Sequence, residues 1–483
     1  MRSTAGFRYE EVANFITALV DTGTLPPGAR APSLRAISKQ RRISLSTAIQ
    51  AYRLLEDRGV LTARPQSGYF IAKRASLQAP RISRPPAKST RVPVSDVALK
   101  LLEHASDPRM APLGCAIPSP AILSAGKLDR FLARAARVMG AEYNTYTLPK
   151  GDPRLRLEIA RRAARWGQVQ SAEDLVITCG CTEALTLALK AVCQAGDTVA
   201  IESPTYFGLL QVIQALNLRA LELPTDPHSG IDVSALEKAL KREPVKACLV
   251  ASSFNNPLGC TMPEERKLAL LRLLAKYKVA LIEDDIYGDI YFGKERPKPF
   301  TALDPEGNRQ GNIVYCSSFS KTVAPGYRIG WIAPGRYMPQ VLAAKFASTL
   351  CGPALPQVAL ADFLASGGYD SHLRRMRRIF ETSIGRMMAT VHKTFPPGTR
   401  ITQPAGGFVL WVELPKGLST RDLFEQALER GICFAPGDVF SVSGRYANCL
   451  RLSCGHGWDA RIESALGTLG QLAGAAMSRS PSN

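Results

Sequence analysis

From about residue 97 onward, short apolar runs alternate with stretches that have the spacing of amphipathic helices. Helical patterns cover residues 182–193 and 263–276, and between such patterns the chain returns to apolar runs of four or five residues. This alternation predicts an α/β domain with a mostly parallel sheet. After Gly406 and Gly407 the pattern changes, which predicts a smaller α+β lobe late in the chain. The runs expected as strands are 175–178, 198–201, 247–251, 279–282 and 313–316.

A proline-rich, basic segment separates this block from the N-terminal part of the chain. Residues 75–95 read ASLQAPRISRPPAKSTRVPVS and hold four prolines and almost no large apolar side chains. Because such a composition cannot supply a core, we expect an extended tether that lets the two blocks move relative to each other. The chain therefore divides into an N-terminal domain at 1–74, a linker at 75–96 and a second domain at 97–483.

The positive charge is concentrated ahead of the second domain. The 483 residues carry 61 Lys and Arg against 41 Asp and Glu, a net charge of +20. Residues 1–95 hold 16 of the basic and 5 of the acidic side chains, so +11 of the excess lies in a fifth of the chain. A basic field of this size favours a polyanion partner, most often nucleic acid.

Composition and the N-terminal sequence narrow the class of protein further. The hydrophobic fraction of 46% is ordinary for a globular chain, and no apolar run reaches the ~18 residues that a membrane span needs. The N-terminus lacks the apolar core of a secretory signal, so we expect a cytoplasmic protein without a membrane partner. Eleven cysteines without a CxxC pair, and only five histidines, predict reduced thiols and no metal site.

The N-terminal domain has the element order of a winged helix-turn-helix. Apolar residues at helical spacing stop at Gly23, and a proline-rich turn leads to a short helix at about 33–40. Ser44 is placed to cap a further helix that ends at Gly59, with small and apolar residues on one face and polar residues on the other. The strands expected for the wing hairpin are 60–63 and 69–72.

The segments LPPGARAPSLRAIS and STAIQAYRLLEDRGVL, together with the wing glycine, resemble the GntR family of DNA-binding domains. In that family the helix after the turn enters the major groove, where arginine and short hydroxyl side chains suit phosphate and base contacts. Position 45, often arginine in relatives, is Leu45 here, so one contact is either absent or moved to Arg41, Arg42 or Arg53. The residues that the resemblance assigns to DNA binding are Arg35, Ser44, Ser46, Thr47, Arg53 and Gly68.

One motif in the second domain carries chemistry directly. The sequence SSFSK ends at Lys321, just after an apolar run that is expected to be a buried strand. Burial lowers the pKa of a lysine, so that its neutral amine can form a Schiff base. Arg328, seven residues further on and close to several hydroxyl side chains, is suited to bind a phosphate ester. The motif therefore indicates a reactive lysine beside a phosphate site.

Four further motifs extend this interpretation: YTLPKG from residue 146, ASSFNNPLG from 251, IEDDIYG from 282 and CLRLS from 449. Their order and spacing resemble fold-type I aminotransferases that use pyridoxal 5′-phosphate (PLP), over about residues 111–477. A GntR-like winged helix linked to such a body resembles the MocR family of bacterial transcription regulators. The resemblance implies a large domain with a mostly parallel sheet and a small α+β lobe.

The resemblance also implies which residues meet the ring of PLP. Lys321 should hold the cofactor covalently, and Asp284 should pair with the pyridine nitrogen so that the ring stays protonated and accepts electrons. Tyr287 and Asn256 should hydrogen-bond the ring oxygen O3′, and Tyr206 should stack on the ring. The catalytic set implied by the resemblance is Lys321, Asp284 and Tyr287.

Further implied contacts concern the phosphate, the substrate and a second subunit. Tyr146 should reach the phosphate from the partner subunit, which predicts a homodimer with shared sites. Arg451, helped by Asn256, should bind the α-carboxylate of an amino acid substrate or effector through a two-pronged pair. The remaining phosphate contacts, which include amides at a helix N-terminus, should come from Cys181, Thr182, Ser318, Ser320 and Arg328.

Some of these residues also have plainer interpretations. Relatives often carry Gln near positions 182 and 183, where this chain has Thr182 and Glu183, so no phosphate contact is assigned to the Glu183 carboxylate. Taken alone, Asp284 could cap a strand end and Arg451 could belong to a structural ion pair. The thiols flanking Gly180 fit small-residue packing better than redox chemistry.

Two functions are compatible with this set of motifs. The first is a transcription regulator that binds operator DNA, with a body that dimerises and senses PLP or an amino acid. The alternative is an active aminotransferase that transfers an amino group from an amino acid to a 2-oxo acid, since the catalytic residues are all present. A PLP enzyme of another reaction type, such as a lyase, is a third and weaker option. The basic head and its linker favour the regulator.

Overall fold

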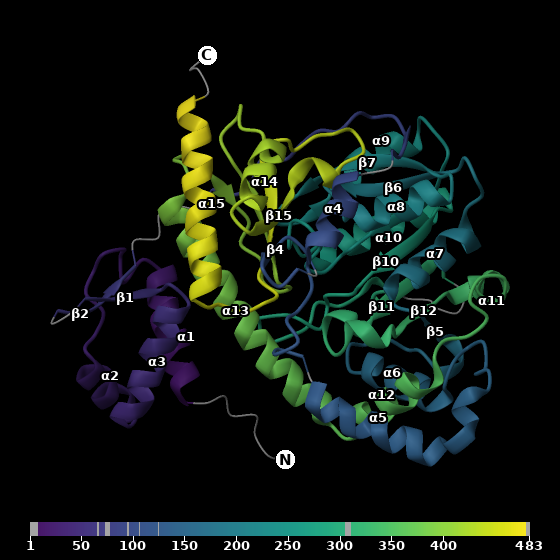
Figure 1. Ribbon diagram of the computed structural model, residues 1–483, viewed down its shortest axis with the longest axis horizontal. Helices are drawn as coiled ribbons and strands as arrows, with labels where there is room; N and C mark the ends of the chain where they lie inside the picture. The colour runs from purple at the N-terminus through teal and green to yellow at the C-terminus, as the bar shows by residue number, and fades with distance from the viewer. Residues whose placement is uncertain are drawn as a thin grey trace.

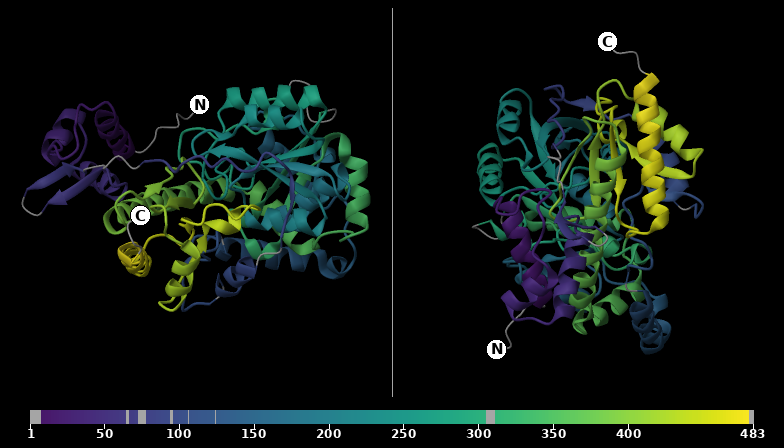
Figure 2. Two further views of the ribbon diagram at one scale, coloured as in Figure 1. Left: turned by 90° about the horizontal axis from the view of Figure 1, so that it is seen from above. Right: turned by 90° about the vertical axis from the view of Figure 1, so that its left-hand side faces the viewer.

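The computed structural model describes residues 8–64, 67–72, 78–93, 96–105, 107–123, 125–304 and 311–479. It has a small N-terminal head, a large α/β domain and a smaller lobe (Figure 1). The head stands at one side of the body, next to the long helix α13 (Gly368–Thr394), which crosses the molecule (Figures 1 and 2).

The head is a winged helix, as predicted. Ser33 and Ser44 each accept a backbone N–H as the N-cap of a helix, and the Tyr52 hydroxyl donates to the Pro32 carbonyl across the core (2.5 Å). The buried face of the third helix packs on the first, since Ala48 and Leu55 are fully buried. Its elements are α1 (Arg8–Asp21), α2 (Leu34–Arg41), α3 (Leu45–Asp57), β1 (Leu61–Arg64) and β2 (Gly68–Ile71).

The large domain is built on a nine-stranded sheet whose central strands are parallel. Alternate residues of one central strand enter two different apolar clusters: Val199 and Ile201 lie in one, Ala200 in the other. Both faces are therefore covered, as is usual for the mostly parallel α/β sheet that the sequence predicts. The strands, in spatial order, are β3 (Thr90–Arg91), β7 (Arg219–Asp226), β6 (Thr198–Ser203), β9 (Val245–Val250), β10 (Ala280–Asp284), β11 (Ile313–Ser318), β12 (Gly330–Ala333) and β5 (Val176–Thr178), with β8 (Gly230–Ile231) beside β7.

Helices surround this sheet, and each of the five predicted strands is present. The pairs β11–β12 and β12–β5 at one end of the sheet and β3–β7 at the other are antiparallel, so the sheet is mixed at both ends. The helices are α5 (Ala125–Met139), α6 (Pro153–Ala164), α7 (Cys181–Val192), α8 (Phe207–Ala215), α9 (Val233–Leu240), α10 (Glu264–Tyr277), α11 (Met338–Phe346) and α12 (Ala354–Ala365).

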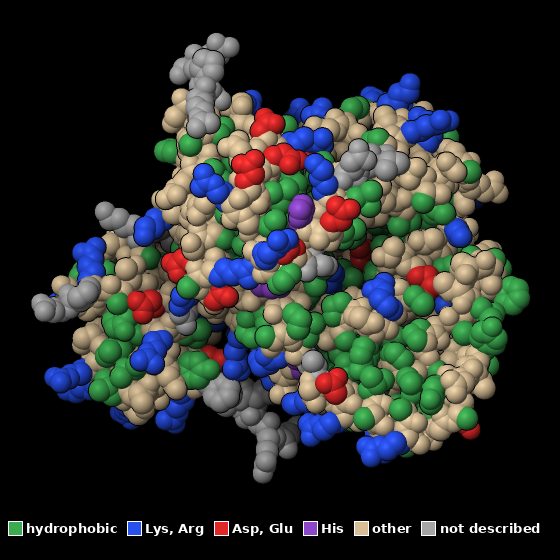
Figure 3. Space-filling view, in the orientation of Figure 1, with side chains coloured by type: hydrophobic (Ala, Val, Ile, Leu, Met, Phe, Trp, Pro, Cys, Tyr) green, Lys and Arg blue, Asp and Glu red, His purple; other side chains and the backbone are tan. Residues whose placement is uncertain are grey.

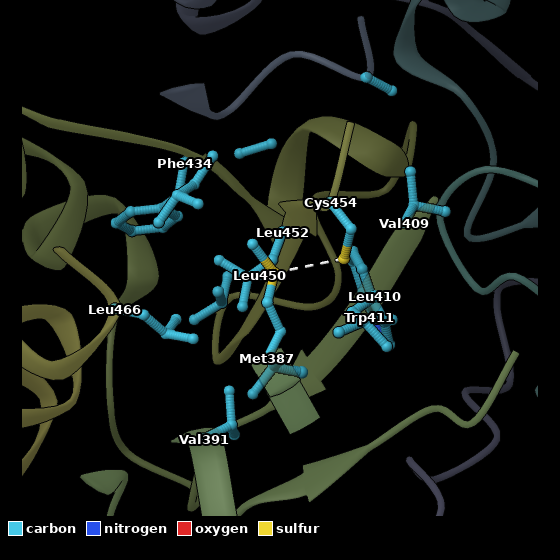
Figure 4. Packing of buried hydrophobic residues seen from close by; sticks show 14 of the residues in the cluster. Met387, Val391, Val409, Leu410, Trp411, Phe434, Leu450, Leu452, Cys454 and Leu466 are labelled. Carbon is cyan, nitrogen blue, oxygen red and sulfur yellow. Dashed lines mark hydrogen bonds between the residues drawn. The ribbon is translucent and has the colours of Figure 1, made fainter. Parts of the chain in front are cut away.

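The small lobe is the predicted α+β unit, with one correction. Its five-stranded sheet takes an edge strand, β4, from far upstream, where Ala111 pairs in parallel with Ile432, so the lobe is not built from late residues alone. Its core packs Trp411, Leu450 and Met387 tightly (Figure 4). The strands are β13 (Arg400–Ile401), β14 (Val409–Glu413), β16 (Cys449–Ser453), β15 (Ile432–Pro436) and β4 (Ala111–Leu113), and the helices are α4 (Asp96–Ala105), α13, α14 (Thr420–Leu428) and α15 (Ala460–Arg479).

The described part of the linker, residues 78–93, is extended as expected but lies against the body. Ile401 donates its N–H to the Gln78 carbonyl (3.0 Å), and the Arg81 N–H donates to Glu413 (2.7 Å). Strand β3 then pairs with the edge of the large sheet. Because both lobes hold this part of the linker, it is not a free tether. The proposed boundaries lie beside residues outside the described ranges and stay predictions.

Two further findings concern the thiols and the helices. All eleven cysteines are free thiols, as predicted. In the part of the chain that the structure describes, no helix is long and apolar enough to cross a membrane, and no three His, Cys, Asp or Glu side chains are grouped to hold a metal ion.

Candidate functional site

The site lies where the parallel strands of the large domain end. Asp284 is the last residue of β10, and Ser318 is the last residue of β11, directly before a 3₁₀ turn that ends in Lys321. Asn256 follows β9 on the same side of the sheet. Ligands of open α/β sheets bind outside the carboxyl ends of the strands. These side chains meet because β9, β10 and β11 are parallel neighbours that end at the same edge of the sheet. The small lobe adds Arg451 from β16.

The ammonium group of Lys321 has an unusually low pKa. Burial lowers the pKa of its ammonium to about 8, and the neighbouring Arg451 charge acts in the same direction. About one molecule in ten then carries a neutral amine at pH 7. The Nζ atom donates a hydrogen bond to the Ala116 carbonyl (2.7 Å). A neutral amine is the form that attacks an aldehyde, so the environment suits the predicted covalent role.

Asp284 provides a half-buried carboxylate at the end of β10. Burial raises its pKa to about 6, while the Cys181 thiol (3.4 Å) and the Ile286 N–H (3.3 Å) donate to it and favour the charged form. A protonated ring nitrogen would add a much stronger partner for this carboxylate. The residue therefore fits the predicted contact with a pyridinium nitrogen.

Arg451 is a buried cation whose hydrogen-bond donors are only partly used. It is 1% exposed, and it donates to the Asn256 side-chain oxygen (3.2 Å) and to the Gly114 carbonyl. Its Nε atom is buried and has no hydrogen-bond partner among the described residues. Tyr287 lies close by, and burial raises the pKa of its phenol. A buried guanidinium with a free donor fits a carboxylate ligand.

A phosphate cradle is formed where α7 begins. Gly180, at a φ of +83°, is the N-cap of α7, and the Arg328 guanidinium donates to the Cys179 carbonyl (2.9 Å). A Cβ at Gly180 would overlap Arg328, so only glycine leaves this space open. The Ser318 and Ser320 hydroxyls lie 2.8 Å apart beside it. Helix amides, a guanidinium and hydroxyls are the donor set that a phosphate ester requires.

The Glu183 carboxylate, to which no phosphate contact is assigned, is already bound by three other groups. Its carboxylate accepts from the Cys179 N–H and the Thr349 hydroxyl, and it lies 3.5 Å from the ammonium of the fully buried Lys345. The ion pair between Glu183 and Lys345 therefore holds the loop that precedes α7. The departure from the family pattern is thus compensated by a lysine on α11.

Replacing Glu183 with Ala should destabilise the protein, because it leaves the Lys345 ammonium buried and unpaired. Breaking a buried pair costs about 3 kcal/mol, which denaturant unfolding of the purified protein would detect. Glu237→Ala is the matched control, since its pair with Lys241 is exposed and contributes less than about 1 kcal/mol. Equal stability of the two variants would contradict this role.

Not every predicted residue joins the cluster. Tyr146 is 83% exposed and forms no hydrogen bond with the described side chains of the site, and Tyr206 is 38% exposed at the start of α8. Thr182 lies at the first turn of α7, with an exposed side chain. These three assignments, like the other site roles, stay predictions.

Sequence reasoning missed two groups of residues next to the site. The carbonyls of Gly114 and Ala116 bind Arg451 and Lys321, and the GCAIP sequence gives no motif for this. Tyr369 and His372, on α13, hold Thr322, the residue after the lysine. Tyr369 and His372 lie on a helix whose hydrophobic pattern predicts burial but no contact with Thr322.

On the head, three of the predicted DNA-binding residues, Ser44, Ser46 and Thr47, lie at the N-terminal end of α3. Ser44 uses its hydroxyl as the cap of α3, 3.1 Å from the Thr47 N–H, and lies 2.8 Å from the hydroxyls of Ser46 and Thr47. Leu45 is 46% exposed at the first position of α3. Arg41 stacks on the Phe15 ring (3.5 Å), which ties it to α1. The other predicted residues with exposed side chains or backbone are Arg35, Arg53 and Gly68.

Comparison with known proteins assigns both parts of the chain to families. Residues 118–469 match the aminotransferase class I and II family, and residues 8–71 match the bacterial regulatory proteins of the gntR family. The fold and the site thus define a winged helix fused to an aminotransferase-type body. The chain belongs to the aminotransferase class I and II family and has the MocR-type architecture of the GntR regulators.

Three relatives illustrate the two halves of this assignment. An uncharacterised HTH-type transcriptional regulator of Escherichia coli K12, YjiR, is 37% identical over 96% of this chain and 98% of its own. A 2-aminoadipate transaminase of Thermus thermophilus is 32% identical over 73% and 87%. The structure of LysN from Thermus thermophilus, an alpha-aminoadipate aminotransferase complexed with N-(5′-phosphopyridoxyl)-L-leucine, has a TM-score of 0.74 at 29% identity, over 80% and 96%. The predicted cofactor, PLP, is confirmed at the level of the family.

Proposed function

We propose that this protein is a transcription regulator of the bacterial cytoplasm, which binds operator DNA with its head and senses PLP or an amino acid with its body. The observation that carries the proposal is that three of the predicted cofactor and substrate residues lie close together in the same chain as a basic winged helix. Arg451 and Asp284 lie close enough to Lys321 to shift its pKa, while Ser44 and its neighbours present hydroxyls on an exposed helix end.

The head is suited to reading DNA through the N-terminal end of α3. Exposed hydroxyls, helix amides and Arg35 and Arg53 can hold phosphates, and recognition helices of this type enter the major groove. Lys and Arg side chains lie on the outer surface of the head (Figure 3). Leu45 offers an apolar contact of the kind that a thymine methyl group accepts.

The body is suited to hold PLP through its own residues. When bound, PLP supplies an aldehyde that condenses with amines and a ring that accepts electron density. Arg328, Ser318 and the start of α7 would hold the phosphate, and Asp284 would keep the ring nitrogen protonated. Arg451 would orient the carboxylate of the amino acid.

A homodimer completes the proposal. Tyr146, Leu148 and Val138 are largely exposed apolar or aromatic side chains close together in sequence, and Phe346 on α11 is 70% exposed. Such side chains favour burial against a second copy. In a dimer Tyr146 would reach the phosphate of the partner site. Two heads would then favour a repeated or palindromic operator.

The alternative function is an active aminotransferase whose head is incidental. Two observations favour it: burial lowers the pKa of the Lys321 ammonium, and Arg451 has a free donor for a substrate carboxylate. Transamination and regulation can coexist in one chain. They are separated by asking whether specific DNA binding exists and responds to PLP.

The deciding experiment is DNA binding at physiological salt, with and without PLP, against random DNA as competitor. The probe would be a fragment selected by the purified protein from a random-sequence pool. A regulator should bind it about 10³-fold or more tightly than random DNA. Failure to select any sequence, together with turnover of amino donors, would instead support the enzyme.

Arg35→Ala should weaken DNA binding through loss of one phosphate contact. The expected change is about tenfold in affinity and about one in the slope of log affinity against log salt. Titration of labelled operator at several salt concentrations measures both. Arg109→Ala is the matched control, because Arg109 is an exposed arginine of the body. An effect on amino acid turnover alone would refute the assignment of the head.

A further inference from the structure

The residue that follows Lys321 is held by one helix of the body. The Tyr369 hydroxyl lies 2.9 Å from the Thr322 hydroxyl, and His372 Nε2 lies 2.6 Å from the Thr322 carbonyl. All three side chains are buried. Burial lowers the pKa of His372 to about 4, so a neutral ring faces the carbonyl and donates to it. Both contacts come from the first turns of α13.

A buried network ties the same turns of α13 to the other side of the site. Tyr369 also donates to Asp289 (3.0 Å), whose carboxylate is paired with Arg162 (3.2 Å) and Arg296 (3.1 Å). Arg296 in turn pairs with Asp285, the neighbour of Asp284. Burial favours a neutral Asp289, but the surrounding guanidiniums outweigh it and lower its pKa. The network therefore links α13 to the residues that follow both Lys321 and Asp284.

The far half of α13 meets the head. Glu381 pairs with Arg58 (3.3 Å), the C-cap residue of α3, and Arg378 lies 3.8 Å from Glu10 on α1. At Gly385 the approach is close, since a Cβ there would lie 3.5 Å from the Arg58 carbonyl. Helix α13 thus touches the end of the helix that is expected to read DNA.

Helix α13 is continuous between its contact with Thr322 and its contact with the head, so a displacement at one contact can reach the other. Tyr369 and Glu381 are twelve residues apart, about 18 Å along a continuous helix. The buried face of α13 passes from the core of the large domain at Tyr369 to the core of the small lobe at Phe380. A cleft of about 1360 Å³ flanks the contact with the head, so the head has room to change its angle (Figure 3).

We propose that α13 couples the cofactor lysine to the DNA-binding head: Tyr369 and His372 hold the residue after Lys321, and Glu381 holds the end of the recognition helix. The inference rests on the proposed function and specifies its regulation. Condensation of Lys321 with PLP changes the hydrogen-bonding capacity of Nζ, and Thr322 is the next residue along. Tyr369 and His372 are positioning residues in this scheme, because they act through Thr322.

The ion pair with the head provides the first test. The measured quantity is the ratio of operator affinities with and without PLP, for the full-length protein. A coupling of ordinary size gives a wild-type ratio of about 5 to 150 in either direction. Glu381→Arg or Arg58→Glu should bring the ratio about fivefold closer to one, and the double variant, which restores the pair with its charges exchanged, should recover it.

The outcomes of this test separate the inference from the proposed function. Glu425→Arg is the matched control, because its partner Lys100 belongs to the body, and it should keep the wild-type ratio. A wild-type ratio of one would overturn sensing of PLP and this coupling with it. A ratio that differs from one in the wild type and stays the same in both single variants would overturn only the coupling through α13.

Tyr369→Phe tests the other end of the helix. The ring and its packing remain, and only the hydrogen bonds to Thr322 and Asp289 are lost. We expect PLP still to be attached to Lys321 at one equivalent per chain, as borohydride reduction and mass spectrometry would show. The affinity ratio should move toward one. Full retention of the wild-type ratio with PLP attached would overturn the role of Tyr369.

Discussion

A Lys321→Ala protein is expected to lose all covalently attached PLP while it remains folded. The side chain ends in an amine whose pKa burial lowers to about 8, and alanine offers no nucleophile in its place. Removing a desolvated ammonium also removes an unfavourable charge beside Arg451, so the substitution should not lower stability greatly. The absorbance band of the attached cofactor should disappear, and no peptide should carry PLP after borohydride reduction.

Two controls make this result specific to Lys321. Lys321→Arg keeps the positive charge but has no amine that condenses with an aldehyde, so it should also lack attached PLP. Lys100→Ala removes an exposed lysine of the body and should load normally. PLP found on another lysine of the Lys321→Ala protein would place the covalent site elsewhere. The Lys321→Ala protein is also expected to show no effect of PLP on operator affinity.

The elements that sequence predicted best are those encoded by neighbouring residues. Ser44 was recognisable as a cap because an N-cap needs only a short hydroxyl ahead of a helix, and its hydroxyl accepts from Thr47. Lys321 was recognisable because an apolar strand ends just before it. In both cases the spacing along the chain sets the geometry.

The features that sequence did not predict depend on distant main-chain or side-chain contacts. Residues 78–93 lack a core composition, yet they bind through backbone groups and an edge strand, which composition does not record. Strand β4 joins a lobe formed mostly some three hundred residues later, because its backbone completes a sheet edge. The contact between Tyr369 and Thr322 spans 47 residues, and the helical pattern of α13 indicates burial without naming a partner.

Arg451→Ala should abolish the response to amino acids while leaving PLP bound. The guanidinium is 1% exposed and has no carboxylate partner among the described residues, with Nε free. Burial lowers the pKa of its guanidinium, which reflects the cost of holding a cation there. A ligand carboxylate would meet that cation in a desolvated environment, where loss of one partner costs about 2–5 kcal/mol. At about 1.4 kcal/mol per factor of ten, the affinity for the amino acid should fall by about 30-fold or more.

The measurement is a titration of the PLP-loaded protein with each of the twenty standard amino acids, followed by the absorbance of the cofactor. Arg451→Lys is the informative companion, since a lysine keeps the charge but not the two-pronged geometry, and we expect it to recover only part of the affinity. The phosphate cradle around Arg328 is untouched by either change, so loading with PLP should stay at one equivalent. An unchanged response in Arg451→Ala would mean that the ligand carboxylate binds elsewhere. A lost response with normal operator binding would show that ligand recognition in the body and DNA recognition in the head depend on separate residues.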